Sequence, residues 1–486
     1  MTATSLAQLA LLVPLAGALL IAALGRWPNL RETATLATAA ALFAIVASLL
    51  PAVLAGERPE AVLATMLPGL TLALRVEPLG MLFAAVASLL WIVNSVYSIG
   101  YMRANGEHKQ TRFYVCFALS LAATMGIAFA GNLLTLFLFY EALTLATYPL
   151  VTHHGTEAAK RGGRTYLGLL IGTSIAFLLL AILWTWQLAG TLEFRPGGIL
   201  AGRAPDALIA VLLALYMFGI GKAALMPFHR WLPAAMVAPT PVSALLHAVA
   251  VVKAGVFSVV KVIVYVFGVD TLAAIDGVQW LPWVAGFTIV AASVVALRSD
   301  NLKRRLAYST VSQLSYVVLA AALLTPLSVL AAALHIAVHA FSKITLFFAA
   351  GAIYTAAHKT EVSQLAGIGR RMPLTMTAFA VGALSLIGVP PMAGFLSKWY
   401  MMGGAFEAGC WAAAAVLAIS TLLNAAYFLP IVHAAFFRAE TAAPAHEHGE
   451  APWPMLLAMA ASAAATIALA ASPDTALALA GALTEH

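Results

Sequence analysis

The chain has 486 residues, of which 63% are hydrophobic and 9% are charged, and its mean hydropathy is +0.95. Because an ordinary soluble domain carries about 25% charged residues, this composition excludes a water-soluble globule and predicts that lipid surrounds most of the apolar surface. The formal charge of +7 does not indicate nucleic-acid binding, since no basic block is interleaved with aromatic residues.

The first apolar run, Met1 to Gly25, has no Lys or Arg before it, and Arg26 and Arg31 come after it. That order of flanks is typical of a retained span with its N-terminus outside, and not of a signal peptide.

Fourteen apolar segments are long enough to cross about 30 Å of hydrocarbon, and the connections between them are short. We therefore expect an all-α, polytopic fold that forms one transmembrane domain over residues 1–486. The segments lie near 5–25, 33–54, 77–101, 113–130, 132–152, 165–188, 206–227, 242–266, 279–297, 306–325, 328–356, 373–405, 409–436 and 452–472.

The positive charges select one orientation. With the N-terminus outside, 17 of the 26 Lys and Arg residues fall in inward loops, 4 fall in outward loops, and 5 lie within spans. The positive-inside rule then predicts an even number of spans with both termini on the outer, periplasmic side of a bacterial inner membrane. The 4 outward residues are Arg58, Arg75, Arg195 and Arg203.

Six charged residues lie inside apolar segments, where each costs on the order of 2.5–3.5 kcal/mol on insertion scales. Such residues usually face the bundle interior, pair with one another and mark ion pathways. A structural ion pair that ties helices together is the alternative, and Lys261, near the outer end of its segment, is also placed to extend to the interface. The six are Glu141, Lys222, Lys253, Lys261, Lys343 and Lys398.

The segment 328–356 carries His335, His339 and Lys343 at i, i+4 and i+8, on one slowly turning face of a helix. Imidazole donates and accepts protons near neutral pH, so this stripe favours proton relay. A zinc site is the rival interpretation, but no carboxylate or thiol in the stripe completes it. Cys116 and Cys410 lie in or beside apolar runs without metal spacing, and they predict neither a disulfide nor a metal site.

Two segments contain helix-breaking residues. The stretch GIGKAALMPFHRWLPAAMVAPTP surrounds Lys222, and SLIGVPPMAGFLSKW contains Lys398 near its end. Proline interrupts a helix, and unwound backbone at membrane depth survives only where protein or water covers it. Segments four to eight (113–266) and nine to thirteen (279–436) start 166 residues apart, and an odd number of spans per unit makes the second unit inverted. Paired interrupted helices in two inverted repeats are typical of transport sites.

These residues resemble the antiporter-like membrane subunits shared by respiratory complex I and Mrp-type cation/proton antiporters. The stretches that carry the resemblance are NLLTLFLFYEALTLATYPLV, GKAALMPFHRWLPAAMVAPTPVSALLHAVAVVKAG, DNLKRRLAYSTVSQLSY, HIAVHAFSKITLFFAAGAIY and GVPPMAGFLSKW. The resemblance implies about fourteen helices, two inverted five-helix repeats and broken helices 7 and 12.

The resemblance also places five residues on functional positions of the family, namely Glu141, Lys222, Lys253, Lys343 and Lys398. Glu141 falls on the fifth-helix glutamate and Lys222 on the seventh-helix lysine that pairs with it; opening and closing that pair would switch the lysine between holding and releasing a proton. From there we expect the proton to pass along the remaining residues in the order Lys253, His335, His339, Lys343 and Lys398.

The resemblance is nearest to the D subunit of an Mrp antiporter, because Lys398 is a lysine where one complex I subunit carries a glutamate and the chain ends soon after the last segment. SQLSY departs from related chains, which often carry a histidine and a glycine there. The resemblance implies other membrane subunits as partners, protons and Na+ or K+ as cargo, and no cofactor.

Three other functions stay open at this stage. The chain is alternatively a proton-pumping subunit of complex I or of a membrane-bound hydrogenase, in which case the redox chemistry belongs to its partners, because it has no iron–sulfur cysteine set and no nucleotide fingerprint. A transporter of an organic substrate and a purely structural scaffold are the remaining alternatives.

Overall fold

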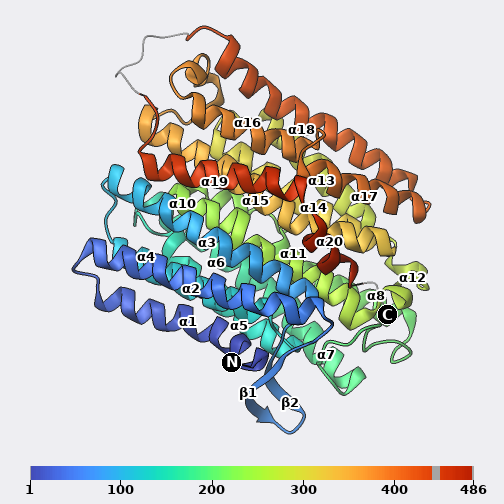
Figure 1. Cartoon of the computed structure of the whole chain (residues 1–486). Helices are drawn as coiled ribbons and strands as arrows, with labels where there is room; N and C mark the ends of the chain where they lie inside the picture. The colour runs from blue at the N-terminus through green and yellow to red at the C-terminus, as the bar shows by residue number, and fades with distance from the viewer. Residues whose placement is uncertain (1, 441–448, 484–486) are drawn as a thin grey trace.

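The computed structural model describes residues 2–440 and 449–483 and shows a bundle of long helices that run in roughly the same direction (Figure 1). In this part of the chain, eleven helices are long and apolar enough to cross a membrane. They are α1 (Ala3–Ala23), α2 (Pro28–Leu54), α3 (Pro78–Ala104), α4 (Gln110–Ala128), α5 (Leu133–Val151), the helix Glu157–Ala189 formed by α6 (Glu157–Thr173) and α7 (Leu180–Ala189), the helix Thr240–Phe267 containing α10 (Thr240–Ala244) and α11 (Val251–Val262), α13 (Trp280–Arg298), α15 (Pro326–Ala357), α18 (Trp411–Phe437) and α19 (Trp453–Ala471).

The other helices complete the set of predicted segments. α14 (Leu302–Ala322) fills the tenth, α8 (Asp206–Gly219) and α9 (Trp231–Ala234) form the interrupted seventh, and α16 (Pro373–Ile387) and α17 (Ala393–Glu407) form the interrupted twelfth. α12 (Val269–Ala273) and α20 (Asp474–Gly481) are short. The polytopic helical architecture and both interruptions are thus confirmed, whereas the number of membrane crossings, fourteen, stays a prediction.

One element was not predicted from the sequence, a β-hairpin between α2 and α3. Strands β1 (Glu60–Leu67) and β2 (Leu70–Arg75) pair antiparallel, with Leu67 opposite Leu70. Pro68 and Gly69 therefore form a two-residue turn, and Gly69 has the positive φ of 80° that favours glycine there. We call the end of the bundle that carries this hairpin the hairpin face, and the opposite end, with the loops 105–109 and 152–156, the basic face.

The first and the last described residues lie toward the hairpin face (Figure 1). α1 packs against both strands, and Ala482, just after α20, lies beside the base of the hairpin. An even number of crossings, as the charge distribution predicts, gives this arrangement.

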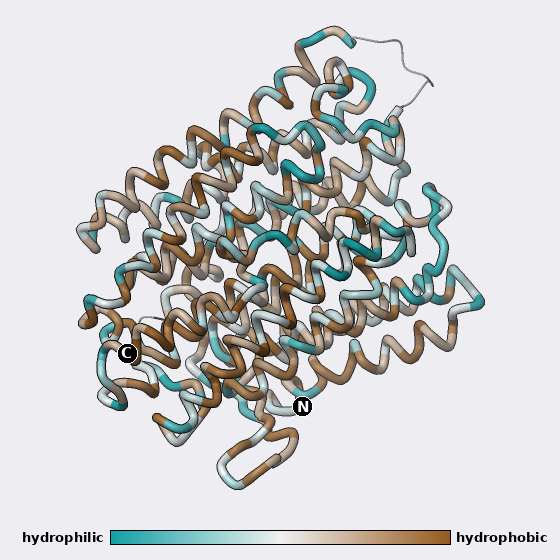
Figure 2. The backbone as a smooth tube through the Cα atoms, turned by 180° about the vertical axis from the view of Figure 1, so that it is seen from behind, coloured by the Kyte–Doolittle hydropathy of each residue, from teal (hydrophilic) through white to brown (hydrophobic). Residues whose placement is uncertain are grey.

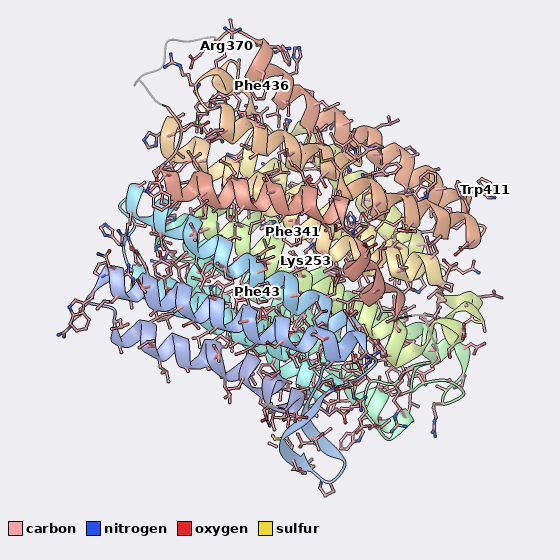
Figure 3. The ribbon with its side chains drawn as sticks, viewed as in Figure 1. Phe43, Lys253, Phe341, Arg370, Trp411 and Phe436 are labelled. Atoms are coloured by element: carbon pink, nitrogen blue, oxygen red, sulfur yellow. The ribbon has the colours of Figure 1, made fainter. Side chains whose placement is uncertain are left out.

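Two helical segments at the centre are covered by protein on all sides. All of the most apolar part of Thr240–Phe267 and of α15 is buried, compared with 33% of that part in α18 and α19. Figure 3 places Lys253 in the middle of the bundle, whereas Trp411 and Phe436 mark opposite ends of the outer helix α18. Apolar positions dominate the helices and hydrophilic ones gather in the end loops, with further hydrophilic positions inside the bundle (Figure 2). Ionisable groups on the central helices therefore contact protein and not lipid.

Candidate functional site

Lys222 lies at the break in the first interrupted helix. After α8 ends, a 3₁₀ turn covers Gly221–Ala223, and Ala224 adopts a left-handed conformation with a φ of 55°. α11 passes close to this turn at Gly255, where a Cβ atom would overlap the backbone of the turn. The absent side chain of Gly255 thus lets the unwound backbone be covered by protein, as backbone at membrane depth requires.

The side chain of Lys222 is held by α5, but not by the expected carboxylate. Its Nζ donates to Tyr140 O at 2.8 Å and to Thr144 Oγ1 at 2.5 Å, and it lies 3.2 Å from the centre of the Tyr140 ring. Within the described residues Glu141 makes no ion pair, and neither of its buried carboxylate oxygens has a hydrogen-bond partner. In this conformation no ion pair or hydrogen bond between described residues joins Glu141 to Lys222, and a pair that opens and closes stays a prediction. Residues 140 and 141 point about 100° apart around a helix, and the lysine faces the Tyr140 side.

Lys253 is connected directly to the histidine stripe of α15. Its Nζ is hydrogen-bonded to His339 Nδ1, and the His339 and His335 rings stack with their centroids 6.2 Å apart. Lys253 and His339 have no exposed surface, and His335 is 1% exposed. The packing of α11 against α15 along the centre of the bundle brings these residues together.

From His335 the polar contacts continue towards Lys398. His335 Nδ1 is 2.9 Å from Ser397 Oγ, and Nε2 is 3.0 Å from Gln313 Oε1. The ring of Tyr316 stacks on His335 at 5.7 Å, and Lys398 Nζ lies 5.0 Å from the centre of the Tyr316 ring. Gln313 and Tyr316 belong to the motif SQLSY, whose departure from related chains was the only signal that could have marked them.

Lys343 lies on a side branch and not in line with the two histidines. Its Nζ donates to Ser309 Oγ at 2.7 Å, and Tyr427 OH donates to the same oxygen at 3.0 Å. Steps of four residues rotate a helix position by about 40° each, so Lys343 faces about 80° away from His335. The predicted order of residues is thus corrected: Lys253 meets His339 before His335, and Lys343 branches away towards α18.

Lys398 reaches back to the second break. α16 ends at Ile387, Gly388 has a φ of 90°, and α17 starts at Ala393. Lys398 Nζ donates to Ile387 O at 2.9 Å and to Thr421 Oγ1 at 3.4 Å, so it satisfies a carbonyl that the helix end leaves free. Lys222 has the opposite arrangement, since it lies at the first break itself and binds a main-chain carbonyl of the continuous helix α5.

Some buried polar atoms on the central helices have no protein partner. In the part of the chain that the structure describes, these include both ring nitrogens of His247 and Nε2 of His339. Buried polar atoms of this kind are the positions where ordered water binds. His247 lies in the motif PVSALLH and was not singled out from the sequence. The described residues contain no group of three or more His, Cys, Asp or Glu side chains arranged to hold a metal ion.

The expectation that Lys261 extends to the membrane interface is wrong. Lys261 has no exposed surface, its Nζ forms an ion pair with Glu77 Oε2 at 2.9 Å, and it donates to Ala130 O at 2.7 Å. Glu77 and Glu32, which the sequence placed at span ends, are 5% and 4% exposed. Position near the end of a segment therefore does not mean exposure, because loops and the hairpin cover these ends.

A second group of ionisable residues lies at the basic face, outside the spans. His154 Nε2 is 3.1 Å from Glu107 Oε1, and its Nδ1 is 3.2 Å from Val237 O at the end of the first break. The hydrogen bond to Glu107 raises the pKa of His154, and although burial acts in the opposite sense, His154 lowers the pKa of Glu107. Burial lowers the pKa of the neighbouring His153 to about 4. The His154–Glu107 contact thus favours an ion pair that fastens the loop 105–109 to the interrupted helix.

A helical membrane bundle with two interrupted helices and a protein-covered row of lysines and histidines defines the class of antiporter-like membrane subunits. The sequence profile of the family described as NADH:quinone oxidoreductase/Mrp antiporter, transmembrane, matches residues 130–424. This chain belongs to that family.

Relatives come from both kinds of complex. The chain is 34% identical over 368 residues to NADH-quinone oxidoreductase subunit N of Desulforudis audaxviator, covering 75% of this chain and 72% of the relative. It is 31% identical over 381 residues to a probable K(+)/H(+) antiporter A/B subunit of Rhizobium meliloti, covering 76% of this chain but only 37% of that longer protein.

Solved structures share the fold over nearly the whole chain. A chain of the Mrp complex from Dietzia sp. matches with a TM-score of 0.88 and 23% identity, covering 99% of this chain and 97% of the other. A chain of an archaeal membrane-bound sulfane sulfur reductase matches with a TM-score of 0.86 and 24% identity, covering 99% and 98%. The likeness extends across antiporter and redox complexes, so it does not separate the two.

Proposed function

We propose that this chain moves protons within a multisubunit membrane complex, and that it is most similar in role to the D subunit of an Mrp-type Na+/H+ antiporter. The observation that carries the proposal is the series of contacts from Lys253 through His339, His335 and Tyr316 to the part-buried Lys398, which consists of one hydrogen bond, two ring-stacking contacts and one cation–π contact. A scaffold needs no such series, and an organic-substrate transporter would need a midplane cavity instead of stacked rings and lysines.

Protons would move along this series by transfer between neighbouring groups. Imidazole accepts a proton on one nitrogen and releases one from the other. His335 is hydrogen-bonded through Nδ1 to Ser397 on α17 and through Nε2 to Gln313 on α14. His339 Nε2 and His247, which lack protein partners among the described residues, are where water would extend the path. Lys343, with Ser309 and Tyr427, forms a lateral branch of the same network.

Glu141 and Lys222 would act as the switch of the first unit. In this conformation Lys222 is bound to Tyr140 and Thr144, one turn apart on α5. A change of its side-chain rotamer would exchange these partners for the carboxylate of Glu141, which has none here. Alternation between the two arrangements would move positive charge towards or away from Lys253.

The two interruptions support the proposal of inverted repeats over 113–266 and 279–436. Adding the offset of 166 to Lys222 gives Gly388, which lies at the second break. The distribution of Lys and Arg favours a bacterial inner membrane with the hairpin face towards the periplasm.

The assignment to an antiporter rests on the lysine at position 398, and partners would be other membrane subunits of the complex. A proton-pumping subunit of a redox complex is the second candidate, favoured by the 34% identity to an NADH-quinone oxidoreductase subunit N. Purifying the chain with its natural partners separates the two: small hydrophobic subunits support the antiporter, and subunits with iron–sulfur clusters overturn it.

The transport proposal is tested in everted membrane vesicles that contain the whole complex. Proton movement after addition of Na+ or K+ is followed with a pH-sensitive dye. We expect Glu141→Gln and Lys398→Ala to reduce the rate by about 100-fold, whereas Glu193→Gln, an exposed carboxylate of the hairpin face, serves as the control. Normal transport by Glu141→Gln would refute the switch, and normal transport by Lys398→Ala would remove that lysine from the path.

A further inference from the structure

The buried pair of Glu77 and Lys261 lies outside the series of residues assigned above. Glu77 stands at the start of α3, and Lys261 comes from α11; their ion pair is 2.9 Å long. Lys261 Nζ also lies 4.4 Å from the centre of the Phe194 ring. An ion pair this well covered costs desolvation free energy that its mutual attraction only partly offsets, so its presence requires an explanation beyond stability.

The carboxylate of this pair borders a cavity at the hairpin face. The cavity has a volume of about 340 Å³, and Glu77 lines it together with Arg58, Glu60, Arg75 and Tyr265. Since one water takes about 30 Å³ in the liquid, roughly ten waters fit. Arg75 is paired with Glu60 and donates to Phe194 O at 3.0 Å, which leaves Glu77 facing both the cavity and Lys261.

Lys261 is also connected to the central series through its own helix. It follows Lys253 by eight residues, which is about 12 Å along α11. Phe257 lies one turn from each, with its ring 5.5 Å from Lys261 Nζ and 5.2 Å from the ring of Phe83. The buried ring of Phe257 thus lies between the two lysines on this side of α11.

We propose that Glu77 and Lys261 form a proton-exchange site through which the central lysines reach the hairpin face. A proton arriving from Lys253 past Phe257 would be accepted at the pair, and Glu77 would pass it to water in the cavity. The proposal rests on the proposed function, since it presumes that protons move through Lys253. It gives the first interrupted unit its own connection to one membrane face.

Transport by the assembled complex tests this site against a purely structural ion pair. Glu77→Gln should reduce proton movement by about 100-fold, while Glu193→Gln, an exposed carboxylate of the hairpin face that does not line the cavity, should leave it unchanged. Normal transport by Glu77→Gln overturns the site. When Glu77→Gln transports normally but Lys253→Met abolishes transport in the same vesicles, only the exchange site fails and the proposed function stands. When both Glu77→Gln and Lys253→Met transport normally, both proposals fail.

The double variant Glu77→Gln with Lys261→Met covers the case in which a single variant does not fold. It removes both charges, so a pair that only fastens α3 to α11 would be replaced without an unpaired charge and transport would return. A proton-exchange site predicts an assembled complex that remains inactive. Recovery of transport in the double variant overturns the proposal.

Access to the cavity gives an independent measurement. In a chain whose two cysteines are replaced by alanine, Tyr265→Cys should react with a membrane-impermeant cationic thiol reagent from the hairpin face and not from the basic face. Absence of reaction from the hairpin face would show that the cavity does not open there, and would overturn the exchange site.

Discussion

Replacing Lys253 with methionine is the sharpest test of the central series. Lys253 has no exposed surface, and its ammonium is hydrogen-bonded to a single group, His339 Nδ1. Leaving that nitrogen without its partner costs about 1–3 kcal/mol, whereas removing a buried charge recovers its desolvation penalty, on the order of several kcal/mol. The two effects oppose each other, so we expect Lys253→Met to fold and assemble normally.

Transport should nevertheless fall steeply in this variant. A positioned group that gives and takes a proton contributes about 100-fold or more to a rate, which corresponds to about 2.7 kcal/mol in the barrier. Lys253→Arg separates proton transfer from charge, because a guanidinium keeps its proton under all ordinary conditions. Arginine should therefore fail as methionine does.

The assay is the initial rate of cation-dependent proton movement in vesicles, divided by the amount of assembled complex. Ser258→Ala is the matched control, since this buried hydroxyl of α11 bonds only the carbonyl of Ala254 in its own helix. Wild-type rates in Lys253→Arg would refute proton transfer through this lysine and leave it an electrostatic role. Wild-type rates in Lys253→Met would refute both.

Two further predictions concern stability. Gly394→Ala places a methyl group on a backbone carbonyl of α16. We therefore expect this variant to lose about 3 kcal/mol or more of stability and to show a clear fall in the melting temperature in detergent. The control is Gly168→Ala, which has open space around it and should stabilise the protein by about 0.5 kcal/mol. Equal melting temperatures of the two variants would contradict the close packing at the second break. The His154–Glu107 pair, with the pKa of His154 raised and that of Glu107 lowered, stabilises the fold between those two pKa values; the contribution is lost as pH rises through the His154 pKa and as it falls through the Glu107 pKa. Because the His154 side chain is 37% exposed, the pair contributes about 0.5 kcal/mol to stability. His154→Gln should flatten the dependence of the melting temperature on pH from 5 to 8, roughly the range around the unperturbed histidine pKa. An unchanged pH profile would show that the pair does not form.

The sequence predicted the elements whose signal is local. Apolar length placed most helix ends within about five residues, although the helix Glu157–Ala189 starts eight residues before its predicted segment. The proline and glycine runs predicted both breaks, because a missing donor interrupts a helix wherever it occurs. A charge inside an apolar run is equally local, which is why Lys222, Lys253 and Lys343 could be singled out and are all without exposed surface.

What depends on the rotation of one helix against another could not be predicted. The sequence cannot show that Lys343 turns towards Ser309, or that Lys222 faces Tyr140 and not Glu141. Lys261 was assigned to the interface because its partner Glu77 is nearly two hundred residues earlier in the chain. The hairpin was missed for a related reason: besides pairing with β1, strand β2 is hydrogen-bonded to Phe129 and Gly131, which lie in the connection between α4 and α5.

The complete burial of Thr240–Phe267 has a consequence for biosynthesis. This segment leaves the ribosome before α14 and α15, which supply much of its cover. Until α14 and α15 are synthesised, Lys253 and Lys261 would each cost about 2.5–3.5 kcal/mol in contact with lipid. The earlier helices α3 and α4 must therefore shelter it, with Glu77 already available to Lys261, and a nascent chain that stops before α15 should be recognised as incomplete and degraded.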